Sequence, residues 1–155
     1  MRNSRAAVYA ASLLALVLAA TASSAAQTVK TCQLFTQQDA AALYGSALQP
    51  PMDVGTMCMY VNPSVGAVVT ITISPATAAS GADFVRVKMG VGKGDTTESI
   101  SGLGDQNLLD IRPNGTNVLT VFYHQKMIVL SVQKHMDTTL KAAMIRAARQ
   151  IMAKI

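Results

Sequence analysis

The feature that most constrains the fold of this 155-residue chain is its pair of cysteines, Cys32 and Cys58. The chain has no further cysteine, so only one intramolecular disulfide is available to it. An even number of cysteines favours such a bridge in a protein that meets an oxidising compartment. In the chain-entropy description, a bridge closing a loop of this length stabilises the folded state by about 3.5 kcal/mol.

The segment 1–26 has the three parts of a secretory signal peptide. Two arginines precede an apolar run over 6–20, and small residues follow as far as Ala26. We expect cleavage after Ala26 and export to the periplasm or the medium, which leaves a single domain over 27–155. The alternative is a retained membrane anchor, but the apolar run is shorter than the roughly 18–20 residues that span a bilayer.

The composition of the remaining chain indicates a folded domain of modest charge. Half of all residues are hydrophobic and 14% are charged, which suits one compact core. Without the two arginines of the signal peptide, the chain contains eleven Lys and Arg residues and eight Asp and Glu residues, which gives a net charge of +3. The cations near the end of the chain, Lys141, Arg146, Arg149 and Lys154, have no aromatic residue among them. A groove that binds nucleic acid needs aromatic side chains on which the bases stack. We therefore expect these cations to lie on the solvent-exposed face of a helix, and we do not expect nucleic acid to be a partner.

In the first half of the domain, the pattern predicts a helix followed by a β-hairpin. Thr36 is a good N-cap and Gly45 a good stop for a helix over Gln37–Tyr44. Pro50 and Pro51 predict an extended linker. Two strands follow, over 57–61 and over 67–74, and the second alternates apolar and hydroxyl residues with a period of two.

The second half predicts a helix, further strands and a terminal helix. The helix begins at Pro75 or nearer Ser80 and ends near Met89, and a glycine-rich loop follows it. Three or four strands come next, over 96–100, 108–112, 118–123 and 127–133. Asp137 should cap an amphipathic helix that runs to the C-terminus. We therefore predict an α+β fold, an antiparallel sheet of about five strands with helices packed on one face.

The sequence Met57-Cys58-Met59 allows two readings. In a strand, Met57 and Met59 share one face and Cys58 points to the other. Thioether sulfur selects Cu(I), so a copper site is one reading, with a third ligand from His124, His135 or another methionine. The favoured reading is a disulfide with methionines that fill the core, because methionines occur in every segment of the chain.

No catalytic constellation is visible in the sequence. His124 falls in a hairpin turn and His135 just before a helix, where solvated histidines are common. Asp105 and Asp110 could act as an acid–base pair only if the fold brought them together, and Asp105 is better explained as a turn residue. The loop 90–94 lacks the spacing of a P-loop. We therefore predict no enzymatic activity, no cofactor and no catalytic residues.

Three short motifs occur in order along the chain. They are Cys32-x-Leu-Phe-Thr-x-x-Asp-Ala-x-x-Leu-x-Gly45, Cys58-x-Tyr60 and Ser101-Gly-Leu-Gly-Asp105. With the hairpin and terminal helix that follow, the chain resembles a broad group of exported bacterial domains of unknown function, many of them small actinobacterial lipoproteins. It is more loosely similar to the extracellular sensor domains of mycobacterial receptor kinases. The resemblance implies a disulfide between Cys32 and Cys58 and an α+β fold, with no catalytic residues. The chain departs from these relatives in having no lipidated cysteine after the leader.

The leading hypothesis is a small exported domain that binds a protein or small-molecule ligand without catalysis. The expected binding surfaces are the sheet face that the helices leave uncovered and the loop over 90–95. A second hypothesis is periplasmic copper handling through Met57, Met59 and a histidine. A third is a hydrolase whose site forms only in three dimensions.

Overall fold

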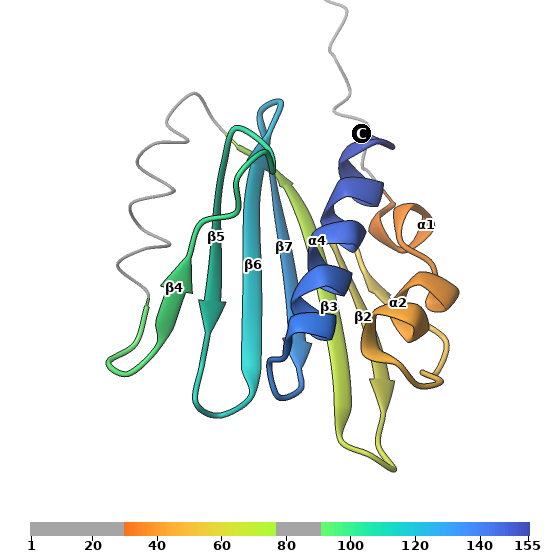
Figure 1. The fold of residues 1–155 in the computed structure, drawn as a ribbon. Helices are drawn as coiled ribbons and strands as arrows, with labels where there is room; N and C mark the ends of the chain where they lie inside the picture. Colours follow the sequence, from red (N-terminus) through yellow and green to blue (C-terminus); the bar gives the residue numbers. More distant parts are fainter. Residues whose placement is uncertain (1–29, 77–90) are drawn as a thin grey trace, which may run out of the picture.

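The computed structural model describes residues 30–76 and 91–155, which form an α+β fold around one antiparallel sheet (Figure 1). The sheet has seven strands, in the order β1-β2-β3-β7-β6-β5-β4, so the prediction of about five was too low. The helices are α1 (Thr31–Leu34), α2 (Gln37–Tyr44) and α4 (Thr138–Met152). The strands are β1 (Met52–Val54), β2 (Met57–Asn62), β3 (Ala67–Pro75), β4 (Thr96–Glu98), β5 (Gln106–Ile111), β6 (Thr116–Tyr123) and β7 (Lys126–Gln133).

Local turns connect most neighbouring strands, and the register follows from them. Gly55 at φ +70° opens the two-residue turn between β1 and β2. His124 and Gln125 have φ values of 46° and 61° in the turn between β6 and β7, as a type I′ turn requires. The long-range pairing is that of β3 with β7, where Ile71 lies opposite Leu130. This pairing joins the three strands β1, β2 and β3 to the other four in one sheet.

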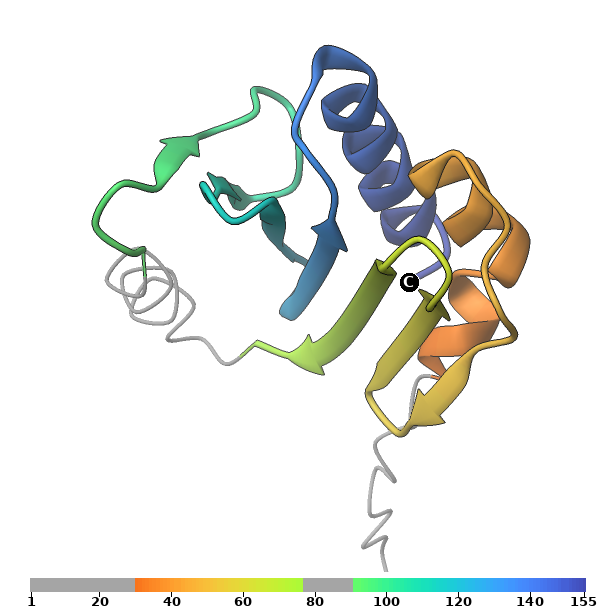
Figure 2. The ribbon, with the colours of Figure 1, turned by 90° about the horizontal axis from the view of Figure 1, so that it is seen from below.

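The three helices of the described residues all lie on the same side of the sheet (Figure 2). Every second residue of β3 and β7 faces the helices and is buried. These side chains form the core together with those of α4, such as Leu140, Met144 and Ile151. The predicted caps are present: the Thr36 side chain accepts from the Asp39 N–H in a capping box, and Asp137 Oδ1 accepts from the Leu140 N–H at 2.6 Å.

Three differences from the sequence-based expectations remain. The short helix α1 was not predicted, and β1 stands where an extended linker was expected. Pro75 ends β3 and does not open a helix. The predicted helix ending near Met89 lies outside the described residues. Within residues 30–76 and 91–155, no helix is long and apolar enough to cross a membrane.

Candidate functional site

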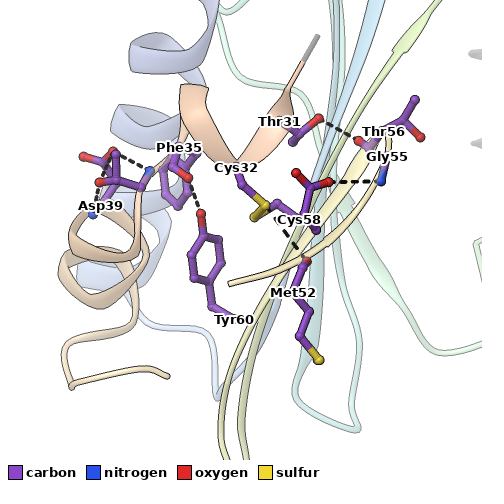
Figure 3. Close-up of a disulfide and its surroundings, with 11 residues drawn as sticks. Thr31, Cys32, Phe35, Asp39, Met52, Gly55, Thr56, Cys58 and Tyr60 are labelled. Carbon is purple, nitrogen blue, oxygen red and sulfur yellow. Dashed lines mark hydrogen bonds between the residues drawn. A yellow bond between two sulfur atoms is a disulfide. The ribbon is translucent and has the colours of Figure 1, made fainter. Parts of the chain in front are cut away.

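The Cys32–Cys58 disulfide joins α1 to β2, as the cysteine count predicted (Figure 3). The Cα atoms are 5.2 Å apart, and Cys58 is fully buried. Thr31, also fully buried, donates from Oγ1 to the Thr56 carbonyl at 2.8 Å, which fixes α1 against the turn between β1 and β2. The disulfide and this hydrogen bond together hold the N-terminal segment against one edge of the sheet.

Tyr60 makes a second connection between β2 and the N-terminal segment. Its hydroxyl donates to the Phe35 carbonyl, and the two rings meet edge to face with centroids 6.2 Å apart. Both side chains are almost completely buried. Burial raises the pKa of the Tyr60 hydroxyl to about 12, and the charges of Asp39 and Asp53 add to the rise. Tyr60 is therefore a neutral hydrogen-bond donor at physiological pH.

The edge strand β1 is held by contacts at both ends. Asp53 Oδ1 accepts from the Gly55 N–H at 3.0 Å, which closes the turn into β2. Cys32 Sγ lies 4.0 Å from the Met52 carbonyl oxygen. In Figure 3 the Met52 side chain points away from the disulfide, toward the opposite side of the sheet.

The side of the sheet opposite the helices is partly exposed over β1, β2, β3 and β7, and we call this region the open face. Its residues lie in register across the four strands, and every one of them is apolar or polar without charge. On β5 and β6 several of the corresponding positions, Leu108, Asp110 and Thr120 among them, are buried. The open face consists of Met52, Val54, Met57, Met59, Val61, Val68, Thr70, Thr72, Ser74, Met127, Val129, Ser131 and Gln133.

Exposure is greatest at the β1 edge of the open face. Met52 is 48% exposed and Val54 is 60% exposed. The other residues of the open face are half-buried, since neighbouring strands shield them. Charged residues commonly protect exposed edge strands, yet the open-face side of β1 presents only Met52 and Val54.

The structure brings the two methionines of the copper reading together but separates the histidines from them. Met57 and Met59 lie on the open face of β2, with Met52 of β1 directly opposite Met59. His124 is in the turn between β6 and β7, and His135 follows β7. Neither histidine shares a cross-strand row with the methionines. Among the described residues, no group of three His, Cys, Asp or Glu could hold a metal ion.

Asp105 and Asp110, weighed as an acid–base pair, do not meet. Asp105 directly precedes β5 and Asp110 lies near its end, roughly 17 Å away along the strand. Asp105 Oδ2 accepts from the His124 N–H at 3.1 Å, a contact that joins two turns. Asp110 Oδ2 accepts from Arg112 Nε at 2.8 Å, and Asp95 Oδ2 lies 3.8 Å from the same nitrogen. The described part of the predicted 90–95 loop is therefore tied to β5 through Arg112.

Asn107 is a structural residue that the sequence did not reveal. It is buried, and its amide nitrogen donates to the carbonyls of Ile100 and Leu103, at 2.8 and 2.7 Å. Its Oδ1 accepts from the Ile100 N–H at 2.6 Å. The loop before β5 is thus folded around one amide side chain. The Ser-Gly-Leu-Gly-Asp motif belongs to this loop, with Leu103 fully buried, so the motif has a packing role.

A shallow hollow lies between α2 and α4. It has a volume of about 90 Å³ and is lined by residues that include Asp39, Arg146 and Gln150. Ligand pockets for small molecules are typically about 300–1,000 Å³, so this hollow is too small to enclose one. Asp39 is also engaged in the cap of α2.

Two of the four C-terminal cations make tertiary contacts instead of only solvating α4. Lys141 pairs with Glu98 of β4, and Lys154 Nζ donates to the Leu34 carbonyl of α1 at 2.7 Å. Arg146 and Arg149 are exposed on α4, as expected. The C-terminal segment therefore connects the edge strand β4 to α1, which lies near the opposite edge of the sheet.

Comparison with models of protein families, with curated proteins and with solved structures gives no match for this chain. The resemblance to exported bacterial domains remains a prediction from its three motifs.

Proposed function

We propose that this protein is an exported, non-catalytic binding domain that engages a partner protein through the open face. The observation that carries the proposal is the composition of that face, which is partly exposed, rich in methionine and without charge. The cores of protein interfaces are depleted in charged residues and enriched in methionine. Surfaces that only contact water normally mix charged residues among apolar ones.

The size of the open face also supports a protein partner. Four strands spaced about 4.8 Å apart, each presenting two to four residues over roughly 15 Å of its length, give a patch on the order of 300 Å². Patches of this size on monomeric proteins are often functional. The patch is smaller than the roughly 800 Å² per partner of a standard interface, so we propose a weak or transient complex, or one that extends past the β1 edge.

The disulfide has a supporting role in this proposal. It holds α1 on the helical side of β2, and Cys32 also contacts the backbone of β1. An edge strand of three residues would otherwise fray, because it pairs on one side only. The open face is therefore presented by a rigid edge, which lowers the ordering cost of binding.

Site-specific photo-cross-linking in producing cells tests the proposal. A photoreactive residue would replace Met59 or Val129 on the open face, and Gln150 on α4 would be the matched control. We expect adducts of discrete mass from the two open-face positions and none from position 150. Adducts from position 150 alone would place the interaction in the hollow between α2 and α4 and overturn the proposal. Absence of adducts from all three positions would also count against it.

A further inference from the structure

Three methionines gather at one corner of the open face. Met52 of β1 lies directly opposite Met59 of β2, and Met57 is two residues from Met59 on the same strand. All three side chains are on the side of the sheet opposite the buried Cys58 and Tyr60. Met52 was not among the candidate ligands named from the sequence, because β1 was not predicted.

The strand geometry allows the three sulfur atoms to meet at one point. Cβ atoms of directly opposite residues are about 4.5–5.5 Å apart, and diagonal neighbours are about 7–8 Å apart. Residues two apart on a strand are separated by about 7 Å. A methionine side chain has three rotatable bonds beyond Cα, so three sulfurs on such a triangle can converge above its centre.

The chemistry of this corner selects a soft monovalent ion. Thioethers are neutral, soft ligands that favour Cu(I), whereas Zn²⁺ and Ca²⁺ require imidazole, thiolate or carboxylate groups. The only thiols of the chain are joined in the disulfide, and the open face has no carboxylate or imidazole among its residues. A harder cation would find no ligand there.

From this geometry we infer that Met52, Met57 and Met59 form a trigonal Cu(I) site at the β1 edge of the sheet. The ion enters as Cu(I) and leaves as Cu(I), so no electron transfer is involved. The site needs neither histidine, and Met52 supplies the third ligand, which the sequence left open between a histidine and another methionine. The inference does not rest on the proposed function, since binding of Cu(I) by the three sulfur atoms can be measured on the isolated protein without any partner.

The test is an anaerobic titration of the purified protein with Cu(I) in competition with bicinchoninate, with Ag⁺ as a redox-inert probe. We expect one ion per chain and shifts of the Met52, Met57 and Met59 methyl signals in the NMR spectrum. Met59→Leu keeps the volume and the apolar character of the side chain and removes a ligand. It should weaken the affinity for Cu(I) at least about tenfold, since the loss of a residue that only holds a ligand in place already lowers metal affinity by that factor.

Met127→Leu is the matched control, because Met127 lies on the same open face but on β7, two strands from β2. Its affinity for Cu(I) should equal that of the unaltered protein. Equal losses in Met59→Leu and Met127→Leu would mean unspecific binding and overturn the site, as would no binding in competition with bicinchoninate. Retained photo-cross-linking in Met59→Leu, with the photoreactive residue at Val129, would show that a failed metal site leaves the proposed protein interaction intact.

Discussion

At the scale of single residues, the Tyr60 hydroxyl gives the stability a defined pH dependence. Its pKa is raised to about 12 in the folded protein, whereas a tyrosine in an unfolded chain titrates near 10. The folded state thus holds this proton more tightly, so the stabilisation is complete below pH 10 and is lost as the pH rises from 10 through 12. We expect the difference in unfolding free energy between the unaltered protein and Tyr60→Phe to shrink over that range. Urea unfolding between pH 8 and pH 11.5 would measure it, and a constant difference would contradict the assignment.

Gly104 and Gly102 make a second residue-scale test, because they share a backbone conformation but not their surroundings. Both have positive φ, 65° and 69°, so alanine is strained at either position. A Cβ on Gly104 would lie 2.5 Å from Val121 Cγ1 and 2.6 Å from the Phe122 carbonyl oxygen, whereas a Cβ on Gly102 meets nothing within 4 Å. Gly104→Ala should therefore cost about 1–3 kcal/mol more than Gly102→Ala, as overpacking does. Equal losses in thermal or urea unfolding would show that the close packing around Gly104 does not matter.

The same scale explains what the sequence could reveal of the candidate site. The alternation of β2 placed Met57 and Met59 on one face and Cys58 on the other, and the structure has them so. Met52 could not be assigned, since its position depends on the pairing of β1 with β2. The role of Asn107 was hidden for a similar reason, because its hydrogen bonds go to a loop whose shape no local pattern specifies.

At the scale of elements, those with local signals were predictable and those held by distant contacts were not. Helix α2 begins and ends where its capping box and Gly45 predict, because both signals lie within a few residues of the helix. Helix α1 is a single turn held by the disulfide and by Lys154 from the other end of the chain. Strand β1 has only three residues, too few for a periodic pattern. The seven-stranded sheet exceeds the prediction because β1 was not expected, whereas β4 falls within the strand considered over 96–100.

At the scale of the whole molecule, the disulfide should account for a substantial part of the stability. Replacing both cysteines by alanine removes the constraint on the unfolded chain and should lower the unfolding free energy by about 3.5 kcal/mol in the chain-entropy description. Chemical unfolding of the double variant against the unaltered protein would measure the difference. A loss well below 1 kcal/mol would contradict this account of the bridge.

In the whole molecule, helices cover one side of a sheet that the disulfide braces, and we propose that the open face, which carries no charged residue, binds a partner. The most direct test is the yield of the photo-cross-link from position 129 when Thr70→Glu places a charge in the middle of the open face. Thr70 is half-buried and its neighbours Met59 and Ser131 are uncharged, so the carboxylate would have no partner in the complex. We predict that the adduct is lost while the variant remains folded, as circular dichroism would show. An undiminished adduct in a folded Thr70→Glu variant would contradict the account.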